Sequence, residues 1–315
     1  MLKNGIAKWK HPCGGLVLLA ALVSFAAGLA AQEKEKPDKR DEQAKDFAEK
    51  FMKALAKAED FDAIKDKVDV PFFMAAERIA GKNLKDREEV QKNLGLPAPP
   101  SKQVYTALAV YSFGALPEKF FNEHEHKLLK ETLTKTDRIV VLRARRLMAV
   151  AVRFKGDEAK VVGIRNHLSP LSLAIASQEK DQGDKRAIQA RKVAQDTVQQ
   201  FLKAAKAKDL DSLVKLNDVP WYSDGEEILK DRQKLNDFLK RIWIDRASSA
   251  QFPSDVLGLI KIGEFGDPFG GERLPATDVV TKDDWLVFVG QNGIARGFML
   301  VRMRDGVAKV VGAGQ

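Results

Sequence analysis

The sequence predicts an α+β protein made of two tandem copies of one domain, each with about three helices ahead of an antiparallel sheet. Two observations lead to this prediction: the order of helical and strand patterns along the chain, and a repeat of that order. The chain has 315 residues, of which 44% are hydrophobic and 31% charged, as is typical of soluble globular domains.

Six short segments recur in the same order, about 150 residues apart. The clearest pairs are Asp-Val-Pro at 69–71 and 218–220, and Ala-Lys-Val-Val-Gly at 159–163 and 308–312. The other four start at residues 51, 60, 85 and 112 in the first copy, and at residues 201, 209, 230 and 264 in the second. A period this long makes each copy a whole domain. We therefore expect a first repeat at 43–167, a linker at 168–189 and a second repeat at 190–315.

Each copy is expected to open with helices. Phe47, Phe51 and Leu55 fall on one face of a first helix, and the second copy repeats this face. A short second helix should end before Pro71 and Pro220, because the residue before a proline avoids the helical conformation. The aromatic pair after each proline predicts the start of an edge strand.

A third helix is expected after Asp86 in the first copy and after Asp231 in the second. Asp86 and Glu89 form a capping box, whereas Asp231 is followed by Lys234 and provides the cap alone.

A meander of strands completes each copy. Asn292-Gly293 and Asp305-Gly306 are hairpin signals. The expected strands are 104–111, 139–142, 147–154 and 159–164 in the first copy, and 256–262, 285–289, 298–303 and 307–311 in the second. The next-to-last strand of each copy is apolar on both faces, so both faces of each sheet must be covered. We infer that the two sheets pack against each other.

The first 31 residues have the pattern of a secretory signal peptide. Three lysines precede an uncharged run at 14–31 that ends in small residues. We expect cleavage after Ala31 and a periplasmic or extracellular protein; the alternative is an uncleaved segment that anchors the chain in the membrane. Residues 32–42 are nearly all charged and are expected to form a disordered tether.

Composition restricts the chemistry of the mature chain. The single cysteine, Cys13, lies in the predicted signal, which leaves neither disulfides nor thiolate metal sites. The signal carries three lysines and no acidic residue, so its removal lowers the net charge from +9 to +6. Basic and acidic residues alternate along the chain, which favours a solvated surface over nucleic-acid binding. We expect no cofactor and no nucleic-acid partner.

The order of elements resembles that of the nuclear transport factor 2-like superfamily, which includes polyketide-cyclase-like and ketosteroid-isomerase-like proteins. The residues of the resemblance are Phe-Leu-Lys-Ala at 201–204, Asp-Leu-Asp at 209–211 and Val-Pro-Trp at 219–221. The resemblance implies a curved sheet wrapped around helices to form a cone-shaped cavity, and often a dimer through the outer face of the sheet. It supplies no catalytic set, because no matching motif is present and fold alone does not give function.

Two residues of the second copy could perform acid–base chemistry in such a cone. Asp218 would be the general base and Tyr222 the proton donor of an isomerase or dehydratase. Phe73 replaces Tyr222 in the first copy, so only the second would be active. The alternative for Asp218, and for Asp69 in the first copy, is a turn in which the carboxylate accepts backbone hydrogen bonds.

Candidate ligand-binding residues also gather in the second copy. Trp221, Trp243 and Trp285 could form the wall of an apolar pocket, or could belong to an ordinary core. Arg302 matches Arg153 in register and could meet an anionic ligand or form an ion pair. The His124-Glu125-His126 segment could bind a metal, but a helix would separate its two imidazoles, so we expect surface histidines and no metal.

These patterns predict an exported, non-catalytic module that binds a small apolar ligand or an envelope protein. The alternative is the isomerase- or dehydratase-like enzyme with Asp218 and Tyr222.

Overall fold

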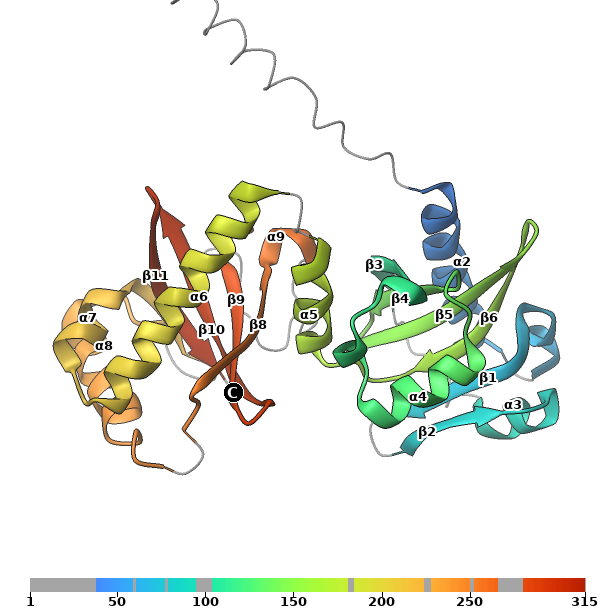
Figure 1. Ribbon diagram of the computed structural model, residues 1–315, viewed down its shortest axis with the longest axis horizontal. Coiled ribbons are helices and arrows are strands. Elements are labelled where there is room, and N and C mark those ends of the chain that lie inside the picture. The colour runs from blue at the N-terminus through green and yellow to red at the C-terminus, as the bar shows by residue number, and fades with distance from the viewer. Residues whose placement is uncertain are drawn as a thin grey trace, which may run out of the picture. The chain divides into compact units, whose positions relative to one another are not determined.

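The protein is an α+β protein with two β-sheets (Figure 1). The computed structural model describes residues 38–58, 61–76, 79–94, 104–180, 184–223, 228–249, 252–265 and 280–314. The predicted signal peptide and most of the predicted tether lie outside these residues. Among the described residues, no helix is long and apolar enough to cross a membrane.

The first sheet has six strands in the order β2-β1-β6-β5-β4-β3, with β1 and β6 parallel and the other neighbours antiparallel. The elements of the segment predicted from the sequence as the first repeat are α2 (Lys39–Leu55), η1 (Phe61–Ala63), η2 (Lys65–Lys67), β1 (Val68–Ala76), β2 (Ile79–Leu84), α3 (Arg87–Leu94), β3 (Thr106–Ser112), η3 (Phe113–Ala115), η4 (Glu118–Phe120), α4 (Glu123–Thr132), β4 (Arg138–Arg143), β5 (Leu147–Lys155) and β6 (Glu158–Arg165).

The second sheet has five strands in the order β7-β11-β10-β9-β8, with β7 and β11 parallel. This is the order of the first sheet without β2. The elements, preceded by α5 (Pro170–Lys180), are α6 (Lys185–Lys206), α7 (Leu210–Leu216), β7 (Asn217–Ser223), α8 (Arg232–Leu239), the π-helical turn η6 (Lys240–Ile244), β8 (Asp255–Lys261), α9 (Ile262–Phe265), β9 (Trp285–Gln291), β10 (Ile294–Arg304) and β11 (Val307–Gly314).

Local sequence signals explain many of these boundaries. The Glu89 amide donates to the Asp86 carboxylate at 2.8 Å, and the Glu89 carboxylate accepts from the Lys85 amide, so the predicted capping box is confirmed. The Asp231 carboxylate caps α8 by accepting from the Lys234 amide at 3.0 Å. Both predicted hairpin turns of the second sheet have positive φ, with 52° and 77° at residues 292 and 293 and 50° and 78° at residues 305 and 306.

Several predicted elements differ from the structure. Helix α2 begins at Lys39, so residues 39–42 are helical rather than a tether. The short second helix is α7 in the second repeat but only the turns η1 and η2 in the first. Strand β1 was expected at a sheet edge, yet β2 pairs with it and makes it internal. The counterpart of that pairing in the second repeat is a single bridge between Trp221 and Leu229.

The expected linker at 168–189 contains helix α5 and the start of α6. Leu173 and Ala174 of α5 are fully buried, and the helix packs against β8. Gly258 of β8 permits this approach, because a Cβ there would lie 3.1 Å from the Ala174 side chain. Arg191 of α6 joins both elements: its guanidinium donates to the Leu259 carbonyl of β8 at 2.7 Å and to the Ser177 carbonyl of α5 at 3.4 Å. Apolar spacing within 170–177 was the signal for this helix.

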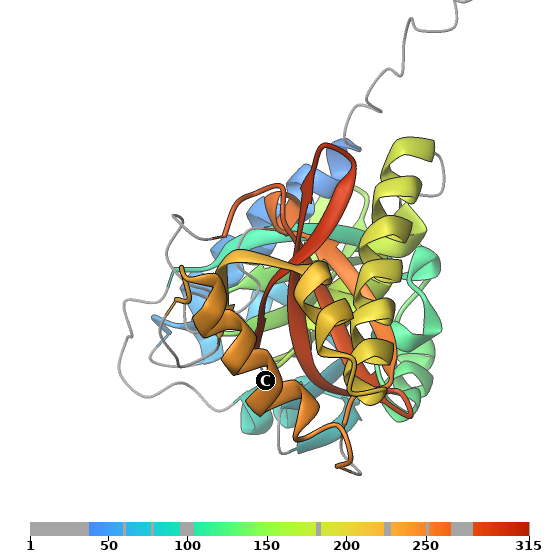
Figure 2. The same cartoon turned by 90° about the vertical axis from the view of Figure 1, so that its left-hand side faces the viewer.

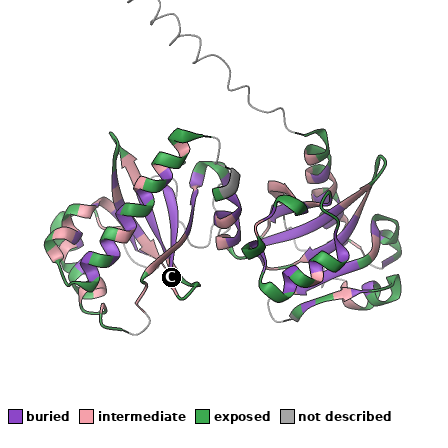
Figure 3. Ribbon diagram, in the orientation of Figure 1, coloured by how far each residue is buried: buried purple, intermediate pink, exposed green. Residues whose placement is uncertain are grey.

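Both faces of each sheet are buried, as the two-faced strands predicted (Figure 3). Helix α2 covers one face of the first sheet, and α6, α7 and α8 cover the corresponding face of the second. Figure 2 views the second sheet from the side of α7 and α8, which lie in front of its strands. The opposite faces belong to a third buried cluster that includes residues of α4 and α5. Direct packing of one sheet on the other stays a prediction.

A buried ion pair recurs in the two repeats. Arg153 Nη2 donates to Asp137 Oδ2 at 2.6 Å, and Arg302 Nη2 donates to Asp284 Oδ2 at 2.6 Å. Asp137 is 2% exposed and Asp284 is fully buried. Each carboxylate also accepts the backbone N–H of the threonine three positions earlier, at 2.8 Å in both repeats. The Asp284 carboxylate raises the pKa of the Arg302 guanidinium above its ordinary value.

The loop that holds this aspartate also recurs. The Gly114 amide donates to the Lys135 carbonyl at 3.0 Å, and the Gly263 amide donates to the Lys282 carbonyl at 2.7 Å. The structural counterpart of Gly114 is therefore Gly263, and the sequence match of residues 112–114 with 264–266 is wrong. A Cβ at either glycine would lie within 2.8 Å of the facing lysine, so both positions require glycine.

Candidate functional site: a cavity in the second repeat

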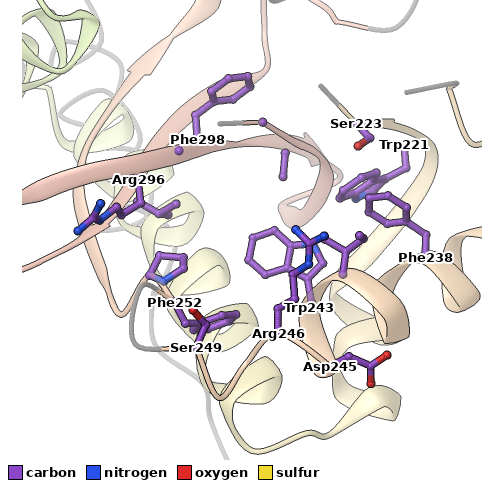
Figure 4. A pocket seen from close by; sticks show the side chains of 16 residues that line it. Trp221, Ser223, Phe238, Trp243, Asp245, Arg246, Ser249, Phe252, Arg296 and Phe298 are labelled. Atoms are coloured by element: carbon purple, nitrogen blue, oxygen red, sulfur yellow. The ribbon is translucent and has the colours of Figure 1, made fainter. Parts of the chain in front are cut away.

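A cavity of about 780 Å³ lies in the second repeat, between the sheet and the segment that follows α8. Five aromatic residues line it: Trp221 from β7, Phe238 from α8, Trp243 from η6, Phe252, and Phe298 from β10, whose side chain belongs to the buried cluster on the other face of the sheet (Figure 4). The first four form an aromatic wall on one side of the cavity, whose remaining lining includes polar and charged side chains.

The aromatic wall is held by contacts between its own rings. Trp221 and Phe238 have ring centroids 4.9 Å apart, and the Trp243 ring stands edge-on to Phe201 at 4.8 Å and to Phe252 at 5.9 Å. The indole N–H of Trp221 donates to Asn217 at 2.9 Å, whereas the buried indole N–H of Trp243 has no hydrogen-bond acceptor among the residues that the structure describes. These contacts keep the rings of the wall in place.

The sheet side of the cavity is lined by small residues. Ser223, Gly297 and Ala313 lie on β7, β10 and β11, with Val289 on β9. A sheet face made of such residues leaves space that large side chains would otherwise fill.

Strand register identifies the counterparts of these small residues in the first repeat. In the second repeat, Ser223 pairs with Ala313 and Gly297 pairs with Val289. The equivalent pairs in the first repeat are Met74 with Ile164 and Met148 with Leu142. The four counterparts are all buried in one cluster, with exposed fractions of 7% or less. At these equivalent sheet positions, the first repeat therefore has two methionines and an isoleucine, whereas the second repeat has glycine, serine and alanine.

Three charged residues also line the cavity: Asp245, Arg246 and Arg296. All three are exposed, and neither arginine forms an ion pair with a residue that the structure describes. In Figure 4, the Arg246 guanidinium lies on the side of Trp243 and Trp221, while the Asp245 carboxylate and the Arg296 guanidinium extend away from Trp243.

The structure brings two of the four predicted ligand-binding residues together. Trp221 and Trp243 line the cavity. Trp285 is 4% exposed and lies in the core, where the Arg191 guanidinium sits 5.4 Å from its ring centroid. Arg302 is in the buried ion pair with Asp284 and does not line the cavity.

The structure does not bring Asp218 and Tyr222 together in this cavity. The Asp218 carboxylate accepts hydrogen bonds from its neighbouring Val219 amide and from Arg232, both at 2.9 Å, and it lies 3.3 Å from Arg304. Tyr222 is buried in the cluster on the opposite sheet face from its neighbour Trp221. Two successive strand residues point to opposite faces, which explains why Trp221 lines the cavity and Tyr222 does not.

The first-repeat candidates are engaged in ordinary contacts. Asp69 forms an ion pair with Lys155 at 2.7 Å. Burial alone would raise the pKa of Asp69, but its hydrogen bond and charge interaction with Lys155 lower that pKa below its ordinary value, which is unsuited to a general base at neutral pH. His124 is exposed on α4, as expected, but the expectation of a surface position is wrong for His126, which is 8% exposed beside Phe113. Burial lowers the pKa of the His126 imidazole.

Within the described ranges, no three His, Cys, Asp or Glu residues are grouped so that they could hold a metal ion. Comparison of the chain with protein-family models and with curated protein sequences found no match. The cavity is thus the candidate site, and the small residues on its sheet side were not predicted from the sequence.

Proposed function

We propose that the protein is an exported, non-catalytic binding module that holds a small apolar ligand in the cavity of its second repeat. The observation that carries the proposal is the replacement of Met74, Met148 and Ile164 by smaller residues at equivalent sheet positions. The aromatic wall opposite them supplies the apolar surface that such a ligand would bury.

We also propose that each repeat is a cone-like domain of the nuclear transport factor 2-like superfamily. In support, both sheets place a parallel pair at the same position of the strand order and carry helices on one face. The first repeat would then be a filled cone that serves as a scaffold, and the second an open one. The apolar run at 14–31 supports export of the chain.

A neutral apolar dye tests the ligand site. N-phenyl-1-naphthylamine fluoresces strongly when it leaves water, and we expect the protein to bind it saturably. Gly297→Met places a large side chain in the cavity and should weaken binding about tenfold or more, or about 1.4 kcal/mol. Gly297 does not have a positive φ, so its backbone accepts a side chain.

Ala295→Met is the matched control, because it adds a methionine to the same strand at an exposed position outside the cavity lining. Circular dichroism checks that both variants fold. Equal binding by the Gly297→Met variant and the Ala295→Met variant would place the dye elsewhere and contradict the proposal.

A further inference from the structure

The charge around the cavity is unbalanced in favour of cations. Asp245 is the one acidic side chain among the lining residues that the structure describes, against Arg246 and Arg296. Figure 4 shows the Asp245 carboxylate directed away from the Arg246 guanidinium. Among the described residues, Arg246 consequently has no carboxylate partner at the cavity.

Of the two arginines, Arg246 is better placed to contact a ligand in the cavity. It follows η6, the turn that places Trp243 in the wall, and its guanidinium lies toward Trp243 and Trp221. A cation next to an apolar wall is less screened by water once a ligand fills the cavity, which strengthens its attraction to an anion. Guanidinium groups also bind planar oxyanions through two parallel hydrogen bonds.

The aromatic rings select the other part of the ligand. Trp243 and Phe252 are half-buried and line the cavity beside the buried rings of Trp221 and Phe238, and aromatic side chains pack favourably against a flat aromatic body. The ligand that matches both features carries an aromatic body in the cavity and an anionic group at its mouth.

We infer that the second repeat binds a small aromatic organic anion, with Arg246 at the anionic group and the Trp221–Trp243 wall at the rings. This inference rests on the proposed function, since it specifies the ligand of the same cavity.

Two dyes with the same rings test the inference. N-phenyl-1-naphthylamine is neutral, whereas 8-anilinonaphthalene-1-sulfonate carries a sulfonate on the same anilinonaphthalene body. We expect the protein to bind the sulfonate dye more tightly than the neutral one. Arg246→Gln should weaken binding of the sulfonate dye about tenfold and leave the neutral dye within about twofold.

Two further variants serve as controls. Arg87→Gln removes the same charge from an exposed side chain of α3 that does not line the cavity, so its effect on the sulfonate dye should stay within about twofold. Arg246→Lys keeps the charge and should restore part of the lost affinity.

The outcomes separate the inference from the function on which it rests. If the Arg246→Gln variant binds both dyes with the affinities of the unchanged protein, the inference of an anionic ligand is wrong. The cavity proposal still stands in that case if Gly297→Met abolishes binding of both dyes. If Gly297→Met alters the binding of neither dye, the cavity proposal and the anion inference fall together.

Discussion

Replacing Asp284 by alanine is expected to lower the free energy of unfolding by about 3–5 kcal/mol, the usual loss when one partner of a buried ion pair is removed. Asp284 is fully buried, and Arg302 donates to it through Nε at 2.8 Å and through Nη2 at 2.6 Å. The substitution removes the carboxylate that pairs with the Arg302 guanidinium, whose side chain is only 11% exposed. It also removes the acceptor of the Thr281 amide.

Urea denaturation followed by circular dichroism measures this loss. The neighbouring Asp283 gives a matched control, because its carboxylate is 67% exposed and pairs with Lys261 at 3.1 Å on the surface. Asp283→Ala should therefore cost about 1 kcal/mol or less. Since the first repeat has the same ion pair, Asp137→Ala should destabilise as strongly as Asp284→Ala. If Asp283→Ala and Asp284→Ala lowered the free energy of unfolding by the same small amount, the buried ion pair would not be a major source of stability.

The second large effect is an asymmetry between equivalent positions of the two repeats. Met148→Gly in the first repeat is expected to lower the free energy of unfolding by about 3–5 kcal/mol, because it removes a buried side chain and adds backbone freedom. Met148 is 5% exposed and packs in a filled core. The reverse change, Gly297→Met, enters existing space and should alter stability by about 1 kcal/mol or less.

Thermal and urea denaturation of the two variants, side by side, measures the asymmetry. Val152 lies in the same cluster and strand as Met148, so Val152→Ala provides a conventional large-to-small reference in the first repeat. A Gly297→Met variant that loses as much stability as Met148→Gly would mean that the corner of the second repeat has no room for a side chain.

Sequence patterns predicted most of the strands and the caps because their signals are local. Alternating apolar residues predicted the strands. Asn292-Gly293 predicted a hairpin, because both residues readily adopt the positive φ values that its turn requires. Strand β2 was missed because it contains Gly81 and Lys82 and lacks a clear alternation. Its place in the sheet depends on pairing with β1, which no local pattern encodes.

The candidate site was predicted only in part. Trp221 and Trp243 stand out in a sequence because tryptophan suits pocket walls, yet Trp285 has the same chemistry and lies in the core. Gly297 drew no attention, because a small residue signals a cavity only when its neighbours across the strands are known. The ion pair of Arg302 likewise depends on a partner 18 residues away in the chain.

The most direct test of the account is a crystal structure of the protein with N-phenyl-1-naphthylamine bound. We expect the naphthyl rings to lie in the second repeat, against Trp221 and Trp243 and above Gly297, while Met74, Met148 and Ile164 fill the equivalent space in the first repeat. Dye bound elsewhere on the protein, or the rings of Trp243 and Phe252 occupying the space themselves, would contradict it.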